Sequence, residues 1–93
     1  MLPDFNRLKV FYYIFMLKSV AGAAVELNIT ASAVSQSLNK LERELKVLLF
    51  TRLHKKLVPT SAGDQLFEIL THFIRDLKAA SSRSGRQKKF LRV

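Results

Sequence analysis

The sequence contains no cysteine among its 93 residues. This absence excludes a disulfide framework, a thiol nucleophile and a zinc site built on thiolates, and it suits a reducing compartment. Long hydrophobic runs are also absent, because the longest, 10–17, has about half the length needed to span a bilayer. Asp4 precedes that run and no small-residue cleavage site follows it promptly, so no signal peptide is expected. We therefore expect a soluble, cytoplasmic protein without a membrane partner.

The residue constellations that support catalysis are missing as well. The sequence shows no carboxylate pair at catalytic spacing and no phosphate-binding loop. His54 and His72 have no further ligand at a useful spacing for a metal. The serine-rich stretches lack the base and the orienting group that a nucleophilic serine requires. We expect neither an enzyme nor a cofactor nor a metal site.

Acidic residues are scarce relative to basic ones. Sixteen Lys and Arg stand against seven Asp and Glu, which gives a net charge of +9 and favours polyanionic partners. The segment 81–93 holds five of the basic residues and no acid, so residues 1–80 carry only +4. Part of this tail, 81–89, has the composition of a linker. Net charge alone therefore places nucleic acid only modestly ahead of other acidic partners.

Helical periodicity dominates what is present. Hydrophobic residues make up 48% of the chain, enough for one core in a domain of this size. Within 4–17, apolar residues recur at spacings of three and four, which predicts a helix at the hub of that core, with Asp4 placed as its cap. The predicted face consists of Phe5, Leu8, Tyr12 and Phe15, broadened by Phe11 and Ile14.

A second, shorter helix is expected over 20–27, with Ser19 as its N-cap. Its buried side would consist of Ala23, Ala24 and Leu27. A brief link follows, in which Asn28 tolerates the left-handed conformation of a tight turn. Thr30 is then placed to cap a third helix over 31–45.

The third predicted helix has two unlike faces. Its apolar stripe consists of Val34, Leu38, Leu41 and Leu45. The opposite face carries Ser32, Ser35, Gln36, Asn39 and Arg43, which are mostly short polar residues. The acids Glu42 and Glu44 are confined to the C-terminal end and are expected to be mainly structural. A polar surface with its acids displaced is typical of a helix that enters a DNA groove.

A short β-hairpin is expected after the third helix. Apolar runs at 48–53 and 57–59 bracket the basic segment 54–56, and Pro59 would stand at a strand end. The basic tip consists of Arg52, His54, Lys55 and Lys56. Such a tip would lie against a DNA backbone or minor groove as a wing.

A last helix is expected to begin at Thr60 or Ser61, one of which caps it, with Asp64 in its first turn. An apolar seam with heptad-like spacing follows for about two repeats. The seam consists of Leu66, Leu70, Phe73 and Leu77. It packs on the domain, pairs with a second copy, or does both with different faces, and we expect dimerisation through it.

Two short helices joined by a three-residue turn form the pattern of a helix-turn-helix. The major groove accepts one helix, and base contacts concentrate in its first turns. Gln36 can pair with adenine through two hydrogen bonds, whereas serine is less selective. The residues expected at base edges are Ser32, Ser35, Gln36 and Asn39. Those expected at phosphates or in the wing are Ser19, Thr30, Lys40, Arg52, Lys55 and Lys56. Asn39 and Lys40 stand farther along the helix, and the alternative for both is that they lie beyond the bases and contact only phosphate.

Five blocks occur in order along about residues 5–80. They are Ser19–Leu27, Ile29–Leu38, Leu41–Leu45, Leu49–Arg52 and Pro59–Gly63. Together, in this order and at these distances, the blocks resemble the DNA-binding domain of LysR-type transcriptional regulators. The resemblance implies a mainly α winged helix-turn-helix, with a three-helix core and a short β-hairpin wing, followed by a linker helix that dimerises.

The resemblance also implies a domain division. Residues 1–60 would form the DNA-binding domain, 61–83 the linker and dimerisation helix, and 84–93 a hinge and the start of an effector-binding domain. In the family that last domain binds small-molecule effectors, and we expect it to be absent from this chain. Because 89–93 resembles its first strand, we expect the chain to be a truncated fragment.

The sequence departs from the family pattern at several positions. Ala31 stands where glutamine is frequent, and Gln36 stands where arginine or lysine is common. Lys18 and Lys46 each replace a glycine. These changes leave the implied fold intact, but base preferences cannot be carried over from the family.

We therefore interpret the chain as a sequence-specific domain of a transcriptional regulator that binds double-stranded DNA. A homodimer, or a tetramer in a full-length protein, would read a pseudo-palindromic site. One rival is a protein-interaction module that uses the last helix for assembly and its basic surface for solubility. Another is a binder of single strands or RNA, although that would require exposed aromatic residues in the first helix.

Overall fold

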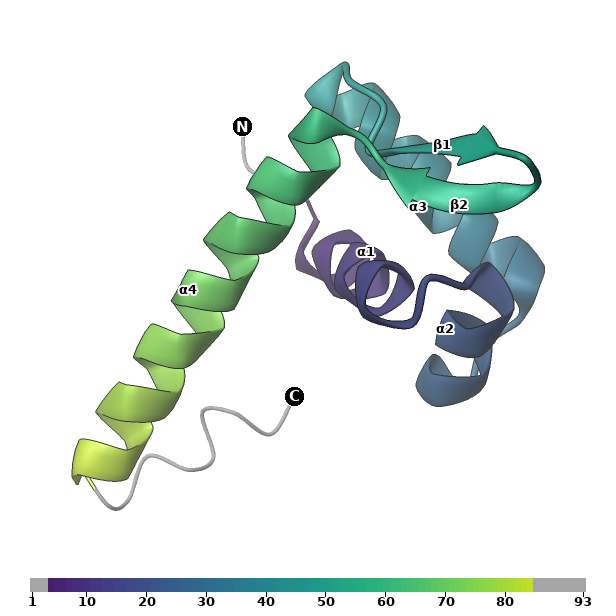
Figure 1. Cartoon of the computed structure of the whole chain (residues 1–93). Helices are drawn as coiled ribbons and strands as arrows, with labels where there is room; N and C mark the ends of the chain where they lie inside the picture. Colours follow the sequence, from purple (N-terminus) through teal and green to yellow (C-terminus); the bar gives the residue numbers. More distant parts are fainter. Residues whose placement is uncertain (1–3, 85–93) are drawn as a thin grey trace.

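The computed structural model describes residues 4–84, and side chains are described as far as residue 80. The elements are α1 (Phe5–Leu17), α2 (Val20–Leu27), α3 (Ala31–Leu45), β1 (Phe50–Leu53), β2 (Lys56–Pro59) and α4 (Ser61–Ser84). Helices α1 to α3 and the hairpin form one body, and the C-terminal part of α4 extends from it as a long arm (Figure 1). The predicted three-helix core, wing and C-terminal helix are confirmed. Residues 81–84, predicted to begin a linker, belong to α4 instead, because the helix continues to Ser84. The predictions for 85–93 lie outside the described residues.

The helix N-termini are capped by side-chain oxygens that accept backbone N–H groups, as predicted. Asp4, Ser19 and Thr30 accept from the amides of Asn6, Gly22 and Ala33 at 2.7, 2.8 and 3.0 Å. For α4, the choice between two residues is resolved in favour of Thr60, whose hydroxyl accepts from the Gly63 amide at 3.0 Å. The helix starts are therefore local features of the sequence.

The C-termini of the first three helices are all in the left-handed conformation. Lys18, Asn28 and Lys46 have φ values of 54°, 58° and 57°. The prediction for Asn28 is confirmed, and asparagine tolerates this region. A lysine there is strained, because its Cβ approaches the neighbouring carbonyl, at a cost of about 1–2 kcal/mol relative to a right-handed residue. Lys18 and Lys46 thus occupy positions that favour glycine.

The core lies where α1, α2 and α3 converge. Its fully buried larger side chains are Phe11, Ile14, Val34, Leu41 and Leu49. The predicted buried stripe of α3 is confirmed, with Leu38 also buried and Leu45 packed at the edge. Ala23 and Ala24 of α2 are buried as predicted, and their small side chains let α2 approach α1 and α3 closely.

The predicted face of α1 is displaced from the buried one. Val10, Phe11 and Ile14 are the residues of α1 that are buried, whereas Phe5 is 56% exposed. The reason is that α1 is packed on two sides, with α2 and α3 on one side and α4 on the other. The core therefore centres on the residues between these two contacts, and the stripe that the sequence emphasised turns toward α4.

The hairpin is antiparallel and tight. Leu53 pairs with Lys56 across a turn formed by His54 and Lys55 alone. Both turn residues have positive φ, 52° and 64°, as in the turns whose twist matches that of a hairpin. Lys56 was predicted within the tip, but it begins β2 instead, because the two-residue turn returns it to the strand pairing. Pro59 ends β2 as predicted.

Helix α4 is anchored at its start. The Thr60 amide donates to the carbonyl of Leu49 at 3.0 Å, and the Thr60 hydroxyl donates to that of Leu48 at 2.6 Å. Gly63 lies so close to the same Leu49 carbonyl that a Cβ at residue 63 would collide with it. Farther along, Phe67 stacks on Phe15 with ring centroids 3.9 Å apart. The first half of α4 therefore belongs to the packed body, and the division at residue 60 stays a prediction.

Candidate nucleic-acid interface

The polar face of α3 is open to solvent in its N-terminal half. The residues predicted to contact bases, Ser32, Ser35, Gln36 and Asn39, are all exposed. They lie on the face opposite to the buried Val34, so the packing of α3 on the body leaves them outward. Lys40 is exposed beside them. This arrangement leaves a helix face with hydrogen-bonding groups available to base edges.

Gln36 is positioned by a neighbour on the same helix. Its amide nitrogen donates to the hydroxyl of Ser32 at 3.3 Å, a pairing that the spacing of four residues permits. The carboxamide oxygen remains available as an acceptor, and the second N–H as a donor. A glutamine that keeps one donor and one acceptor can still form the two hydrogen bonds that adenine offers.

The acids of α3 are engaged in structural contacts. The carboxylate of Glu42 accepts from the Leu49 amide at 2.8 Å and fixes the loop that leads into β1. The carboxylate of Glu44 accepts from the Arg7 guanidinium at 2.6 Å and ties α3 to α1. The expectation that both acids are mainly structural is confirmed. Both carboxylates lie in the last turn of α3, away from the polar residues of its first turns.

A groove runs between the start of α2, the start of α3 and the hairpin. It is lined by Lys18, Ser19, Val20, Ala21, Ala31, Arg52, Lys55, Lys56, Leu57 and Val58. Four predicted phosphate or wing residues, Ser19, Arg52, Lys55 and Lys56, are thus brought together. The lining contains no carboxylate, so its electrostatic potential suits an anion. Thr30 caps α3 next to Ala31, whereas Lys40 lies outside this groove.

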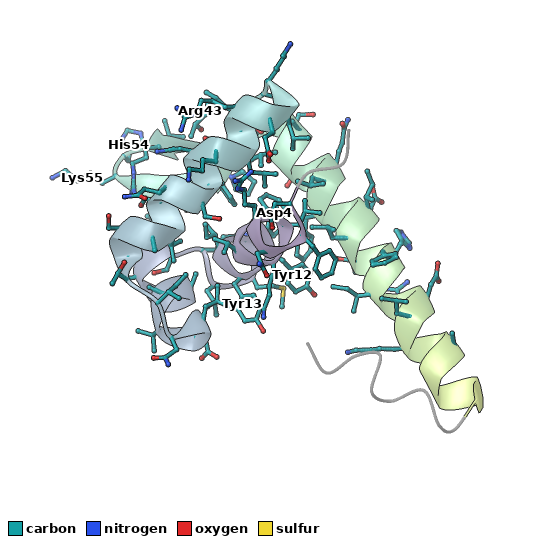
Figure 2. The ribbon with its side chains drawn as sticks, turned by 180° about the vertical axis from the view of Figure 1, so that it is seen from behind. Asp4, Tyr12, Tyr13, Arg43, His54 and Lys55 are labelled. Atoms are coloured by element: carbon teal, nitrogen blue, oxygen red, sulfur yellow. The ribbon has the colours of Figure 1, made fainter. Side chains whose placement is uncertain are left out.

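One further basic residue lies on the same side. Arg43 is exposed, and it continues the polar face of α3 one turn beyond Asn39. Figure 2 shows the labelled side chains of Arg43, His54 and Lys55 on the side of the molecule away from α4. The spacing of four residues from Asn39 is the signal in the sequence that identifies Arg43 as an additional candidate.

The seam of α4 is divided between two environments. Leu70 is 9% exposed and Leu66 packs against the core, so both are largely used within the chain. Phe73 remains 47% exposed. Phe73 and Leu77 instead line an apolar groove between α4 and α1, to which Phe5, Leu8, Tyr12 and Tyr13 also contribute. The dimerisation role of the seam stays a prediction.

Residues 4–84, which the structure describes, offer neither a metal site nor a membrane-spanning helix. Among those residues, no three His, Cys, Asp or Glu side chains are grouped as a metal ion would need. In the same range, no helix combines the length and the apolar character required to cross a membrane. The polar face of α3 and the basic groove beside it are therefore the features that a function must explain.

Comparison with known proteins gives one consistent result. The model of the bacterial regulatory helix-turn-helix proteins of the lysR family matches residues 5–64. The HTH-type transcriptional activator AmpR of Rhodobacter capsulatus is 36% identical over 85 residues, which are 89% of this chain and 29% of that protein. The chain thus spans less than a third of the length of this curated relative.

Solved structures agree with the family match. A transcriptional regulator of the LysR family from Eggerthella lenta DSM 2243 is 44% identical and superposes with a TM-score of 0.69, covering 76% of this chain and 99% of that one. The DNA-binding domain of CbnR in its complex with DNA is 26% identical, with a TM-score of 0.73 over 87% of this chain and 93% of that one. The similarity therefore includes a protein solved on DNA.

Proposed function

The chain belongs to the LysR family of bacterial regulatory helix-turn-helix proteins, and from this premise we propose that it binds double-stranded DNA for transcriptional regulation, with α3 in the major groove. Its relatives are named as transcriptional regulators, not as enzymes. The observation that carries the proposal is the pairing of an exposed, acid-free polar face on α3 with an adjoining basic groove.

We assign base contacts to the polar face of α3 and phosphate contacts to the basic groove. Ser32, Ser35, Gln36 and Asn39 would contact base edges and supply discrimination. The groove residues Ser19, Arg52, Lys55 and Lys56, together with Thr30 and Lys40, would contact phosphates and supply most of the affinity. Arg43 would extend the phosphate contacts at the far end of α3. His54 and Lys55, at the tight turn, would reach toward the minor groove as a wing.

The assembly we propose is a dimer that reads a pseudo-palindromic site. The part of the α4 seam beyond the core, the exposed Phe73 and the partly buried Leu77, is the surface available for a second copy, together with the apolar groove beside α1. Leu66 and Leu70 would support it from within the core. In a full-length protein, tetramers and control by a small-molecule effector would involve a further domain. The cytoplasm, where bacterial DNA lies, would be the place of action.

The test is the dependence of binding on salt. With about four to six phosphate contacts per copy, affinity for a labelled duplex of mixed sequence should fall steeply as salt rises. Lys55→Ala should weaken binding to all sequences alike, whereas Gln36→Ala should reduce the preference among sequences. A flat salt response of the unmodified chain would reject DNA binding as proposed.

The same titration separates the rival functions. Competition with unlabelled single strands or RNA should displace the duplex poorly. Efficient displacement would favour a single-strand binder, which the packing of Tyr12 and Phe15 against Phe67 already disfavours, since these rings are not free to stack on bases. Self-association without duplex binding would favour the protein-interaction module.

A further inference from the structure

The basic groove contains one cation that the resemblance to the family did not assign. Lys18, the C-cap of α1 just before α2, lines this groove together with Arg52, Lys55 and Lys56 of the hairpin. We propose that Lys18 is a phosphate-contacting residue, and that this groove holds the DNA backbone that separates the major from the minor groove. This inference rests on the proposed function.

The placement follows from where the neighbouring elements would lie on DNA. If α3 enters the major groove and the hairpin tip reaches the adjacent minor groove, one phosphate backbone must pass between them. The groove between α3, α2 and the hairpin is the space that this backbone would occupy. Lys18 then approaches the backbone from the side opposite to the wing, so that cations contact it from both walls.

The backbone conformation of Lys18 supports a functional role for its side chain. Its φ of 54° and ψ of 34° lie in the left-handed region, where glycine is favoured. The amide of Lys18 donates to the carbonyl of Ile14 at 2.7 Å, and a glycine would make the same hydrogen bond. The helix end therefore gains nothing from the lysine backbone. If the lysine side chain is needed for binding, we expect a lysine at this position in spite of the backbone strain.

The ammonium group of Lys18 has neutral partners among the described side chains. It donates to the carbonyl of Phe15 at 3.1 Å and lies 4.0 Å from the centroid of the Phe15 ring. Among the described side chains, the one ion pair joins Arg7 to Glu44 and leaves Lys18 with neutral partners. Exchange of a neutral carbonyl for a phosphate oxygen gives a stronger, charge-assisted hydrogen bond.

The experiment compares three substitutions on a labelled mixed-sequence duplex of about two and a half helical turns. Lys18→Gln removes the charge and keeps most of the length, Lys18→Arg keeps the charge, and Lys18→Gly relieves the left-handed strain. Arg75→Gln is the matched control, because Arg75 is exposed on α4 and lies outside the basic groove. Affinity is measured across a range of salt concentrations, and thermal stability is measured in parallel.

We expect Lys18→Gln and Lys18→Gly to bind about three- to tenfold more weakly at low salt, with the salt slope reduced by about one per copy. Lys18→Arg should bind like the unmodified chain, and Arg75→Gln should change little. Lys18→Gly should also melt at a higher temperature, so that weaker binding could not be attributed to unfolding.

Two results would overturn the assignment. If the neutral variants retain both the affinity and the salt slope of Arg75→Gln, Lys18 serves only as the helix end. If they bind more weakly without a change in the salt slope, Lys18 acts through the position of α3 rather than through a phosphate contact. Steep salt dependence of the unmodified chain in either case would leave the proposed function standing, whereas a flat response would remove both proposals.

Discussion

The two halves of α3 differ in what their polar side chains contact. In the N-terminal half, Ser32, Gln36 and their neighbours are exposed, and their hydrogen-bonding groups face solvent or each other. In the C-terminal half, Glu42 holds the loop before β1 and Glu44 holds α1. The polar residues of the N-terminal half are therefore free to bind, whereas the two acids of the C-terminal half hold the domain together. Polarity alone therefore does not identify a binding residue, because the partner of each polar group decides its role.

The buried stripe common to both halves should give the largest effect. Leu41→Ala removes a fully buried side chain and should lower the free energy of unfolding by about 3 kcal/mol. Urea denaturation measures this change. Val25→Ala is the control, because Val25 is 78% exposed on α2 and its truncation should change stability by less than about 0.5 kcal/mol. Equal losses from both variants would contradict the assigned core.

The two acids in the C-terminal half of α3 should contribute unequally to the stability of the domain. Glu42→Ala leaves the Leu49 amide without its partly buried, charged acceptor, and we expect a loss of about 2 kcal/mol. Glu44→Ala breaks a partly exposed ion pair with Arg7 and should lose less than about 1 kcal/mol. Denaturation of the two variants side by side gives the order. A greater loss for Glu44→Ala would reverse our ranking of the anchors.

Lys46, which follows the C-terminal half of α3, is a residue whose replacement by glycine should stabilise the domain. Lys46 has a φ of 57°, so Lys46→Gly should raise the free energy of unfolding by about 1 kcal/mol through relief of left-handed strain. Lys40→Gly removes the same side chain inside α3 and should instead lower stability by about 1 kcal/mol. Thermal melting shows both signs. Destabilisation by both glycines would mean that the lysine side chain, rather than the backbone, governs residue 46.

The binding half should show the smallest effect on stability. Gln36→Ala removes an exposed side chain. Its amide nitrogen donates a hydrogen bond to Ser32, which is also exposed. We expect the free energy of unfolding to change by less than about 0.5 kcal/mol, in contrast to Leu41→Ala. Denaturation under the same conditions measures it. A loss above about 1 kcal/mol would place Gln36 with the holding residues instead.

Much of this architecture was predictable because it is locally determined. The caps at Asp4, Ser19 and Thr30 and the turn at Asn28 involve partners only a few residues away, so composition and spacing sufficed. The apolar stripe of α3 followed from its period. The exposed polar face was predictable for the same reason, since it is the remainder of that helix.

The contacts that were not predicted join segments distant in the sequence. The Arg7–Glu44 pair spans 37 residues, and no local pattern indicates it. The buried face of α1 depends on α4 packing against its other side, so the stripe of α1 alone gave a displaced centre. The groove that gathers Lys18 with Arg52 and Lys56 exists only once α2 and the hairpin are placed side by side. These features required the tertiary arrangement.

The claim that the N-terminal half of α3 reads DNA is tested most directly by selecting bound sequences from a random duplex pool, with the unmodified chain and with Gln36→Ala in parallel. We predict that the unmodified chain enriches a defined sequence. The variant should retain most of that sequence and lose its preference at one or two adjacent base pairs, with adenine the base expected there. Enrichment of the same sequence with the same preferences by both chains would contradict the assignment of this face to base readout.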